Sequence, residues 1–312
     1  MADKYLGIQT QIYKNNQRTI LMLALFPVLV AALVWIFFFL FLGFTLAYES
    51  SGFFSLQNFQ MTSLLTLQVL PWVIGICFIW FVIAYFINVK IITRATRSKT
   101  LRRNDNKRVY NLVENLCMAG GMPMPKVNVI EDDALNAFAS GINEKTYTVT
   151  LTRGIIEKLD DDELEGVIAH ELTHIRNRDV RMLIVSIVFV GIFSTLAIIM
   201  LRSISFRGKK NIIMILIALG VAALGVLLSS LMRFAISRKR EYMADAGATE
   251  LTKKPHALAS ALRKISDNPH VNYVTDKAVA QLFIENALAG KNSSWFASHP
   301  PILKRIEILE QF

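Results

Sequence analysis

Two histidines and a glutamate in the run Ala169-His170-Glu171-Leu172-Thr173-His174 have the spacing of a hydrolytic metal site. Residues four apart share one face of an α-helix, so His170 and His174 can bind the same zinc ion. Glu171 lies beside the first histidine and is placed to act as a general base, not as a ligand. On these three residues alone, an exposed helix with two unliganded histidines stays open as the alternative.

A catalytic zinc site normally has three protein ligands and keeps one position open, so a third ligand must come from elsewhere. The best candidate is Glu241, in a second helical stretch. Asp245 follows one turn later on the same face, where it could accept the second N–H of a ligand histidine. A charged helix face with surface ion pairs is the competing interpretation. His256 and His270 have no motif partner and are expected at the surface.

Two further stretches complete a set of four motifs that resembles the HtpX-type membrane zinc metalloproteases, relatives of the CAAX prenyl proteases. The stretches are, in order, 136–141, 170–174, 238–245, and Ser298-His299-Pro300-Pro301 followed by Arg305-Ile306. The resemblance implies one zinc ion per subunit, held by His170, His174 and Glu241, with Glu171 as the catalytic base. It also implies that substrate backbone adds as a strand along the sheet edge formed by Asn136, Ala137, Phe138, Ala139 and Ser140.

His299 is open to two interpretations. Beside Pro300-Pro301 it could simply close a turn before a final helix over 302–310. In the family that the chain resembles, the matching histidine faces the zinc, where it stabilises the oxyanion or occupies the open position at rest. We therefore expect His299 in the active site, but not as a permanent ligand.

The composition indicates an integral membrane protein. Hydrophobic residues make up 53% of the 312 residues, and the mean hydropathy is +0.41. Four stretches are long and apolar enough to cross about 30 Å of hydrocarbon: Leu21–Leu42, Leu64–Val89, Met182–Leu201 and Asn211–Met232. A buried or re-entrant hairpin stays open as the alternative for the last two.

The basic residues predict the orientation in the membrane. Lys and Arg flank the first hairpin before residue 19 and after residue 89, and the loop between its spans has none. By the positive-inside rule, the N-terminus and the segment after residue 89 are cytoplasmic. The net charge of +10 is therefore expected to meet anionic headgroups, not nucleic acid. The loop 202–210 carries four basic residues against this rule if both later segments cross.

The predicted fold is mainly α-helical: four transmembrane helices and a zincin-like α+β protease domain with a small β-sheet. Residues 1–92 form the first hairpin, 93–108 a basic cytoplasmic linker, and 109–312 the protease domain, interrupted by the second hairpin. Short strands are expected at 126–131 and 146–151. The helices outside the membrane are expected at 109–118, 161–178, 234–251, 255–265 and 302–310.

The resemblance implies an endopeptidase of the bacterial cytoplasmic membrane that cuts misfolded or damaged membrane proteins on the cytoplasmic side during stress. Self-cleavage is expected for such an enzyme. Two alternatives remain, a zinc-binding scaffold without turnover and a protease that processes prenylated peptides. The intact Glu171 argues against the scaffold. A transporter is disfavoured because the four spans contain no internal Asp, Glu, Lys, Arg or His to mark an ion path.

Overall fold

The computed structural model describes residues 8–46, 53–185, 239–272, 274, 277–280, 282–285 and 300–312, together with scattered positions between 188 and 227. These residues form two compact units. We call the first the α/β unit, which comprises residues 1–16, 87–184 and 236–312, and the second the hairpin unit, which comprises 17–86 and 185–235. Each unit draws on segments that are far apart in the sequence.

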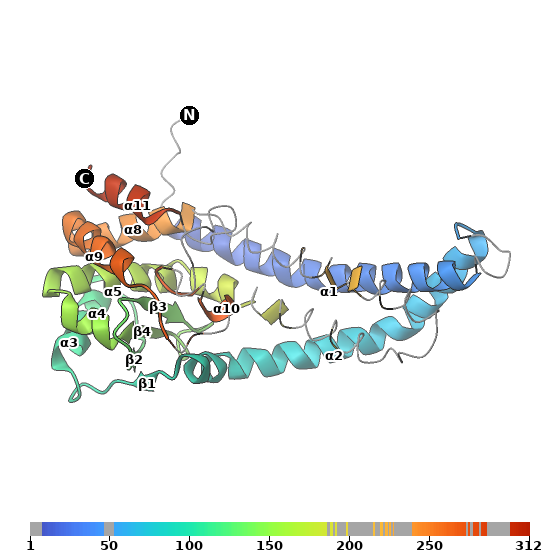
Figure 1. Ribbon diagram of the computed structural model, residues 1–312, viewed down its shortest axis with the longest axis horizontal. Coiled ribbons are helices and arrows are strands. Elements are labelled where there is room, and N and C mark those ends of the chain that lie inside the picture. Colours follow the sequence, from blue (N-terminus) through green and yellow to red (C-terminus); the bar gives the residue numbers. More distant parts are fainter. Residues whose placement is uncertain are drawn as a thin grey trace. The chain divides into compact units, whose positions relative to one another are not determined.

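Two long helices, α1 (Ile8–Leu46) and α2 (Leu56–Thr96), supply most of the hairpin unit and run antiparallel side by side (Figure 1). Trp35 of α1 packs edge-on against Phe59 of α2 at 5.6 Å between ring centroids. Their apolar stretches, Ile12–Gly43 and Leu56–Ile87, are long enough to span a bilayer. The predicted spans Leu21–Leu42 and Leu64–Val89 lie within these two helices.

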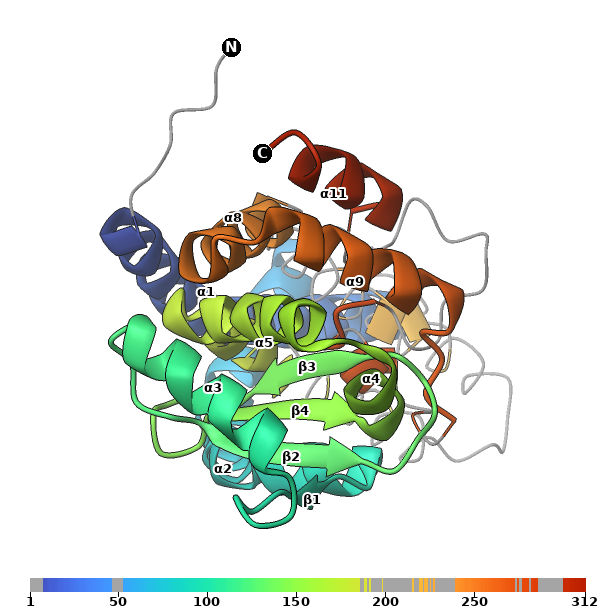
Figure 2. The same cartoon turned by 90° about the vertical axis from the view of Figure 1, so that its left-hand side faces the viewer.

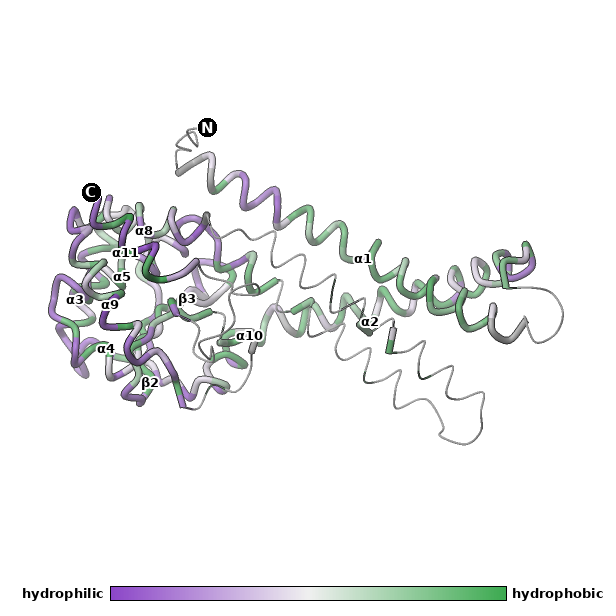
Figure 3. Tube along the Cα trace, turned by 45° about the horizontal axis from the view of Figure 1, so that its top comes forward, coloured by the Kyte–Doolittle hydropathy of each residue, from purple (hydrophilic) through white to green (hydrophobic). Residues whose placement is uncertain are grey.

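Large apolar side chains point outward from both helices of the hairpin. Trp72 is 76% exposed and Leu67 is 68% exposed, and the helices are strongly hydrophobic over most of this length (Figure 3). Exposed apolar surface on this scale is unfavourable in water and favourable in hydrocarbon. The hairpin therefore has the surface of a membrane-embedded element.

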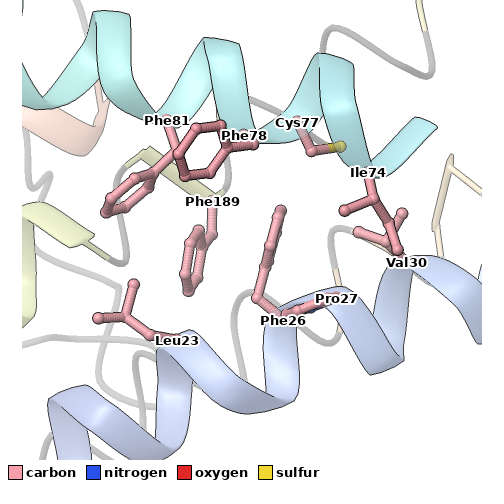
Figure 4. A pocket seen from close by; sticks show the side chains of 9 residues that line it. All are labelled: Leu23, Phe26, Pro27, Val30, Ile74, Cys77, Phe78, Phe81 and Phe189. Atoms are coloured by element: carbon pink, nitrogen blue, oxygen red, sulfur yellow. The ribbon is translucent and has the colours of Figure 1, made fainter. Parts of the chain in front are cut away.

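An apolar cavity of about 240 Å³ lies inside the hairpin unit (Figure 4). Phe189 enters it and stacks on Phe26 at 3.9 Å between centroids. The side chains that line the cavity include no Asp, Glu, His, Lys or Arg; they are Leu23, Phe26, Pro27, Val30, Ile74, Cys77, Phe78, Phe81 and Phe189. This described lining therefore offers no group for acid–base chemistry.

The sheet of the α/β unit has four strands in the order β1-β2-β4-β3. They are β1 (Lys99–Thr100), β2 (Lys126–Ile130), β3 (Ala137–Ser140) and β4 (Thr148–Thr152). β2 and β4 are parallel, whereas β1 and β3 pair antiparallel with their neighbours. The two predicted strands are confirmed as β2 and β4, with ends shifted by one or two residues. β3 forms one edge of the sheet, with Phe138 opposite Thr150 of β4.

Helix α5 (Asp161–Arg176) is central to the α/β unit: it lies along β3 and packs against α8 (Lys239–Thr252) and α9 (Pro255–Asp267) (Figure 2). The remaining helices are α3 (Lys107–Ala119), α4 (Arg153–Lys158), α10 (Lys277–Ala280) and α11 (Ile302–Leu309). The mainly helical fold with a small mixed sheet is as predicted. The segments 182–201 and 211–232 lie largely outside the described residues.

Local sequence explains where α5 begins. The Asp160 side chain accepts a hydrogen bond from the Glu163 N–H, and the Glu163 side chain accepts one from the Asp160 N–H, which completes a capping box. Leu164, Val167 and Leu172 follow at helical spacing and are fully buried. The predicted start at residue 161 is confirmed.

The predicted end of this helix was wrong by two residues. α5 stops at Arg176, and Arg178 adopts a left-handed conformation with φ 60° before helical conformation resumes at Asp179. This backbone region is sparsely populated by residues other than glycine, so it breaks the helix. The break turns Asp179 back toward the face of α5 that carries the histidines.

The close approach of α5 and α8 depends on Gly247. A Cβ atom at this position would lie 2.4 Å from the Thr173 Cγ2 atom, well inside van der Waals contact. The absence of a side chain lets the two backbones pack closely. α8 can therefore present Glu241 and Asp245 to the histidines of α5.

Candidate metal centre

Three donor side chains meet between α5 and α8. The Nε2 atoms of His170 and His174 are 3.2 Å apart, and Glu241 Oε2 lies 3.6 Å from the first and 3.7 Å from the second. Among the described residues, these three form the group of His, Cys, Asp and Glu side chains that could hold a metal ion. The structure thus brings together the three residues expected as ligands.

The spacing of the three donors can be compared with that of a zinc site. Zinc bonds of about 2.0–2.1 Å in tetrahedral geometry place neighbouring donor atoms ~3.3 Å apart. The observed separations of 3.2, 3.6 and 3.7 Å are close to this value. Two imidazoles and one carboxylate are also a donor set typical of catalytic zinc. The residues therefore fit a zinc ion with one coordination position left open.

Each histidine is bonded through Nδ1 to a carboxylate. His170 Nδ1 lies 2.9 Å from Asp245 Oδ1, and His174 Nδ1 lies 3.1 Å from Asp179 Oδ2. A carboxylate only accepts hydrogen bonds, so each Nδ1 carries a proton, and loss of any second ring proton leaves the lone pair on Nε2. Both rings are thereby held in the tautomer that binds a metal through Nε2.

Arg305 of α11 lies behind the His170 side of the site and is completely buried. Its guanidinium donates to both oxygens of Asp245, from Nε at 2.9 Å and from Nη2 at 2.7 Å. Burial alone would raise the pKa of Asp245, but Arg305 and His170 outweigh it and lower this pKa. Asp245 is therefore held as a carboxylate.

The buried charges around the site leave a negative excess. Among the described residues, four carboxylates are buried there, on Glu171, Asp179, Glu241 and Asp245, against two guanidinium groups, on Arg240 and Arg305. With neutral histidines the excess is two negative charges, which a divalent cation would balance. Without a metal, burial lowers the pKa of His174, but the Glu241 and Asp179 carboxylates outweigh it and raise this pKa to about 10.

Glu171 is 2% exposed and lines a cavity of about 20 Å³ together with His174 and Glu241. A space of this size can hold about one water molecule. Ala139, Asp179, Val180, Leu183, Arg240 and Leu282 complete the lining. Glu171 is not one of the three grouped donors, but its carboxylate lines the same small cavity as two of them, His174 and Glu241.

Of residues 136–140, Ala139 lines this cavity, and part of the outer edge of the stretch is paired within the chain. The Asn136 amide donates to the backbone carbonyls of Pro269 and Glu285, both at 2.8 Å. The Ile284 N–H donates to the Ala137 carbonyl at 2.8 Å, and Phe138 pairs with Phe283. Further along β3, Ala139 lines the cavity, and Ser140 pairs with Thr148 on the inner side.

Two of the remaining three histidines are among the described residues. His256 and His270 are exposed, as predicted. His299 lies outside the described residues.

The sequence did not predict that Asp179 would bond to His174. Arg305 was noted only as part of the fourth motif, without a role. Asp179 follows the helix break at Arg178, so no helical period relates it to His174. Arg305 is 135 residues from His170 in the sequence. The one available signal for Arg305 was its place in the fourth motif.

The sequence and the structure were compared with known proteins. Residues 103–312 match the protein family described as "Peptidase family M48". A "Protease HtpX homolog" of Bacteroides fragilis is 57% identical over 99% of this chain and 100% of its own length. A protein of the same description from Dictyoglomus thermophilum is 40% identical over 73% of this chain and 79% of its own. The solved structure of S. mikatae Ste24p is 20% identical, with a TM-score of 0.46 over 96% of this chain and 66% of that one.

Proposed function

The chain belongs to peptidase family M48 and is a membrane-bound metalloprotease, and we propose that it is a zinc endopeptidase whose metal is held by His170, His174 and Glu241. The observation that carries this proposal is the triangle of donor atoms, 3.2 to 3.7 Å on a side, with Glu171 at the adjoining cavity. When bound, zinc would supply Lewis acidity to polarise the scissile carbonyl and to acidify a water molecule.

Glu171 moves the protons in this mechanism. Its carboxylate takes a proton from the attacking water and delivers it to the leaving amine, the base and acid halves of peptide hydrolysis. Its side chain is 2% exposed and lines a cavity of about 20 Å³, which has room for about one water molecule. Asp245 and Asp179 hold the imidazoles in orientation, so the chain's own hydrogen bonds organise the centre before substrate arrives.

The substrate backbone is proposed to add along β3. Asn136 and Ala137 are already bonded to residues 284 and 285 and to Pro269, so the cavity-lining position Ala139 is where substrate pairing would begin unless the 282–285 segment moves. Phe138 and Ser140 support the strand from within the sheet. His299 is proposed to act at the same cavity as an oxyanion stabiliser or a resting-state ligand.

We further propose that the enzyme lies in the bacterial cytoplasmic membrane with four crossings, 21–42, 64–89, 182–201 and 211–232. The basic residues on both flanks of the first hairpin support a cytoplasmic N-terminus and protease domain. Residues 1–92 would then form the anchor, 93–108 the linker and 109–312 the protease. Misfolded or damaged membrane proteins, exposed on the cytoplasmic side, are the proposed substrates, and self-cleavage is expected.

The test compares wild type with Glu171→Gln, both purified in detergent without zinc. Zinc is added, cleavage of unfolded casein is followed, and bound zinc is measured. We expect wild type to cut casein and itself, and Glu171→Gln to bind zinc with activity lower by at least ~10³-fold, because a glutamine cannot accept the proton. Zinc binding without cleavage in both proteins would favour a scaffold. Absence of zinc binding in wild type would refute the metal assignment.

A further inference from the structure

The His174 side of the site is bonded to the first helix of the chain. The Asn15 side chain, on α1, is completely buried. Its Nδ2 atom donates to Asp179 Oδ1 at 2.7 Å and to the Asn177 backbone carbonyl at 2.8 Å. Asp179 uses its other oxygen, Oδ2, to accept from His174 Nδ1 at 3.1 Å. A chain of two hydrogen bonds therefore connects α1 to a proposed metal ligand.

The chemistry of this contact suits asparagine specifically. Both partners are acceptors, a carboxylate and a carbonyl, so the residue between them must offer two donors in one plane. An asparagine amide does so without adding charge. An aspartate would instead place a second carboxylate against Asp179, and an apolar side chain would leave Oδ1 of a nearly fully buried carboxylate without this donor.

We infer that Asn15 is a positioning residue for the metal site: it fixes Asp179, which in turn orients the imidazole of His174. Asn15 lies four residues before the uncharged stretch that starts at Thr19. The helix that enters the membrane therefore also completes the support of a metal ligand. A merely structural role, in which Asn15 only docks α1, predicts lost stability with unchanged metal binding. This inference rests on the proposed zinc site.

The next residue provides a matched control. Asn16 Oδ1 accepts a hydrogen bond from Arg178 Nη1 at 3.2 Å, so it joins the same helix to the same loop without bonding to Asp179 in the described contacts. Asn15→Leu and Asn16→Leu each remove a polar contact of α1 and keep the number and branching of the side-chain heavy atoms. Only the first removes a donor to the carboxylate that orients His174.

The experiment measures zinc affinity of the full-length proteins in detergent by competition with a chromophoric chelator. Cobalt(II) absorption reports the ligand geometry. We expect Asn15→Leu to weaken zinc binding by about tenfold and to alter the cobalt spectrum. Asn16→Leu should stay within about twofold of wild type, although both variants lower the melting temperature. Asn15→Ser, whose hydroxyl can satisfy only one of the two acceptors, should also weaken binding and serves if the leucine variant does not fold.

A double-mutant cycle then tests the route. If Asn15 acts through Asp179, Asn15→Leu should have no further effect on zinc affinity in an Asp179→Ala background. Unchanged zinc affinity of Asn15→Leu, beside a wild type that binds zinc, would overturn this inference and leave the proposed function intact. A wild type that binds no zinc would overturn both. Additive losses in the double variant would show that Asn15 acts by another route and would also overturn it.

Discussion

The two histidines of the metal centre are supported by carboxylates that are themselves held in different ways. Behind His170, Asp245 is bonded by the Arg305 guanidinium through two hydrogen bonds. Behind His174, Asp179 is bonded by the neutral amide of Asn15. We call these the His170 arm and the His174 arm. The first arm contains its own balancing charge, whereas the second reaches outside the protease helices to α1.

The arms also differ in exposure. The His170 side chain is 0% exposed and that of His174 is 12% exposed. His174 lines the cavity that Glu171 shares, and His170 does not. The His170 arm is therefore the more deeply buried foundation of the site, and the His174 arm lies beside the cavity. This difference predicts that breaking the first arm costs more stability and more zinc affinity than breaking the second.

The largest expected effect comes from Arg305→Leu. This variant leaves Asp245 as a buried carboxylate without its guanidinium, which should lower the free energy of unfolding by about 3–5 kcal/mol. Denaturant unfolding of the zinc-free protein in detergent measures it. Arg263→Leu is the matched control, because that arginine pairs with Glu310 at the surface and is 60% exposed. Its loss should cost at most about 1 kcal/mol. Equal costs for the two variants would refute the foundation role of the His170 arm.

The sequence predicts the local half of this site well. The capping box at Asp160 and the apolar stripe after it are contained within α5, so its start and the facing of His170 and His174 could be predicted from neighbouring residues. Glu241 and Asp245 are one turn apart on α8, and the structure brings both to the histidines. These positions depend on helical period, which is visible in sequence.

The other residues of the site are placed by contacts that no helical or strand periodicity in the sequence reveals. Asp179 reaches His174 because Arg178 breaks the helix with a left-handed residue, and a helix predicted to run through residue 178 hides this turn. Asn15 is 164 residues from Asp179, and Arg305 is 60 residues from Asp245. β3 was likewise not predicted as a strand from its own pattern, because all four of its residues are buried and show no alternation. Long-range packing decides each of these features.

A smaller effect is expected on zinc affinity when either supporting carboxylate, Asp245 or Asp179, is replaced. Asp245→Asn removes the charge that holds Arg305 and should weaken zinc binding by about 100-fold, whereas Asp179→Asn should weaken it by about tenfold. Both changes are isosteric, so the comparison isolates hydrogen bonding and charge from packing. Chelator competition at one pH, with melting temperatures as a control on folding, measures both. A larger loss for Asp179→Asn would reverse the assignment of the two arms.

The His174 arm should also make zinc binding depend on pH. Burial opposes protonation, but Glu241 and Asp179 raise the pKa of His174 to about 10 in the zinc-free protein. Because the folded pKa lies above the unfolded value of about 6.5, the stabilising contribution of His174 is fully present below pH ~6.5 and is lost as pH rises through about 10. Zinc must displace this proton, so apparent zinc affinity should rise about tenfold per pH unit between pH ~7 and ~9.

Proton release measured with an indicator dye in weak buffer at pH ~8 should give about one proton per zinc bound. In Asp179→Asn one of the two carboxylates that raise the pKa is gone, so this release and the pH slope should both diminish. Asp245→Asn leaves the carboxylates facing His174 in place and should keep the slope while binding zinc more weakly. An identical slope in wild type and Asp179→Asn would mean that Glu241 alone sets the proton affinity of His174, and the His174 arm would then orient the ring without tuning its charge.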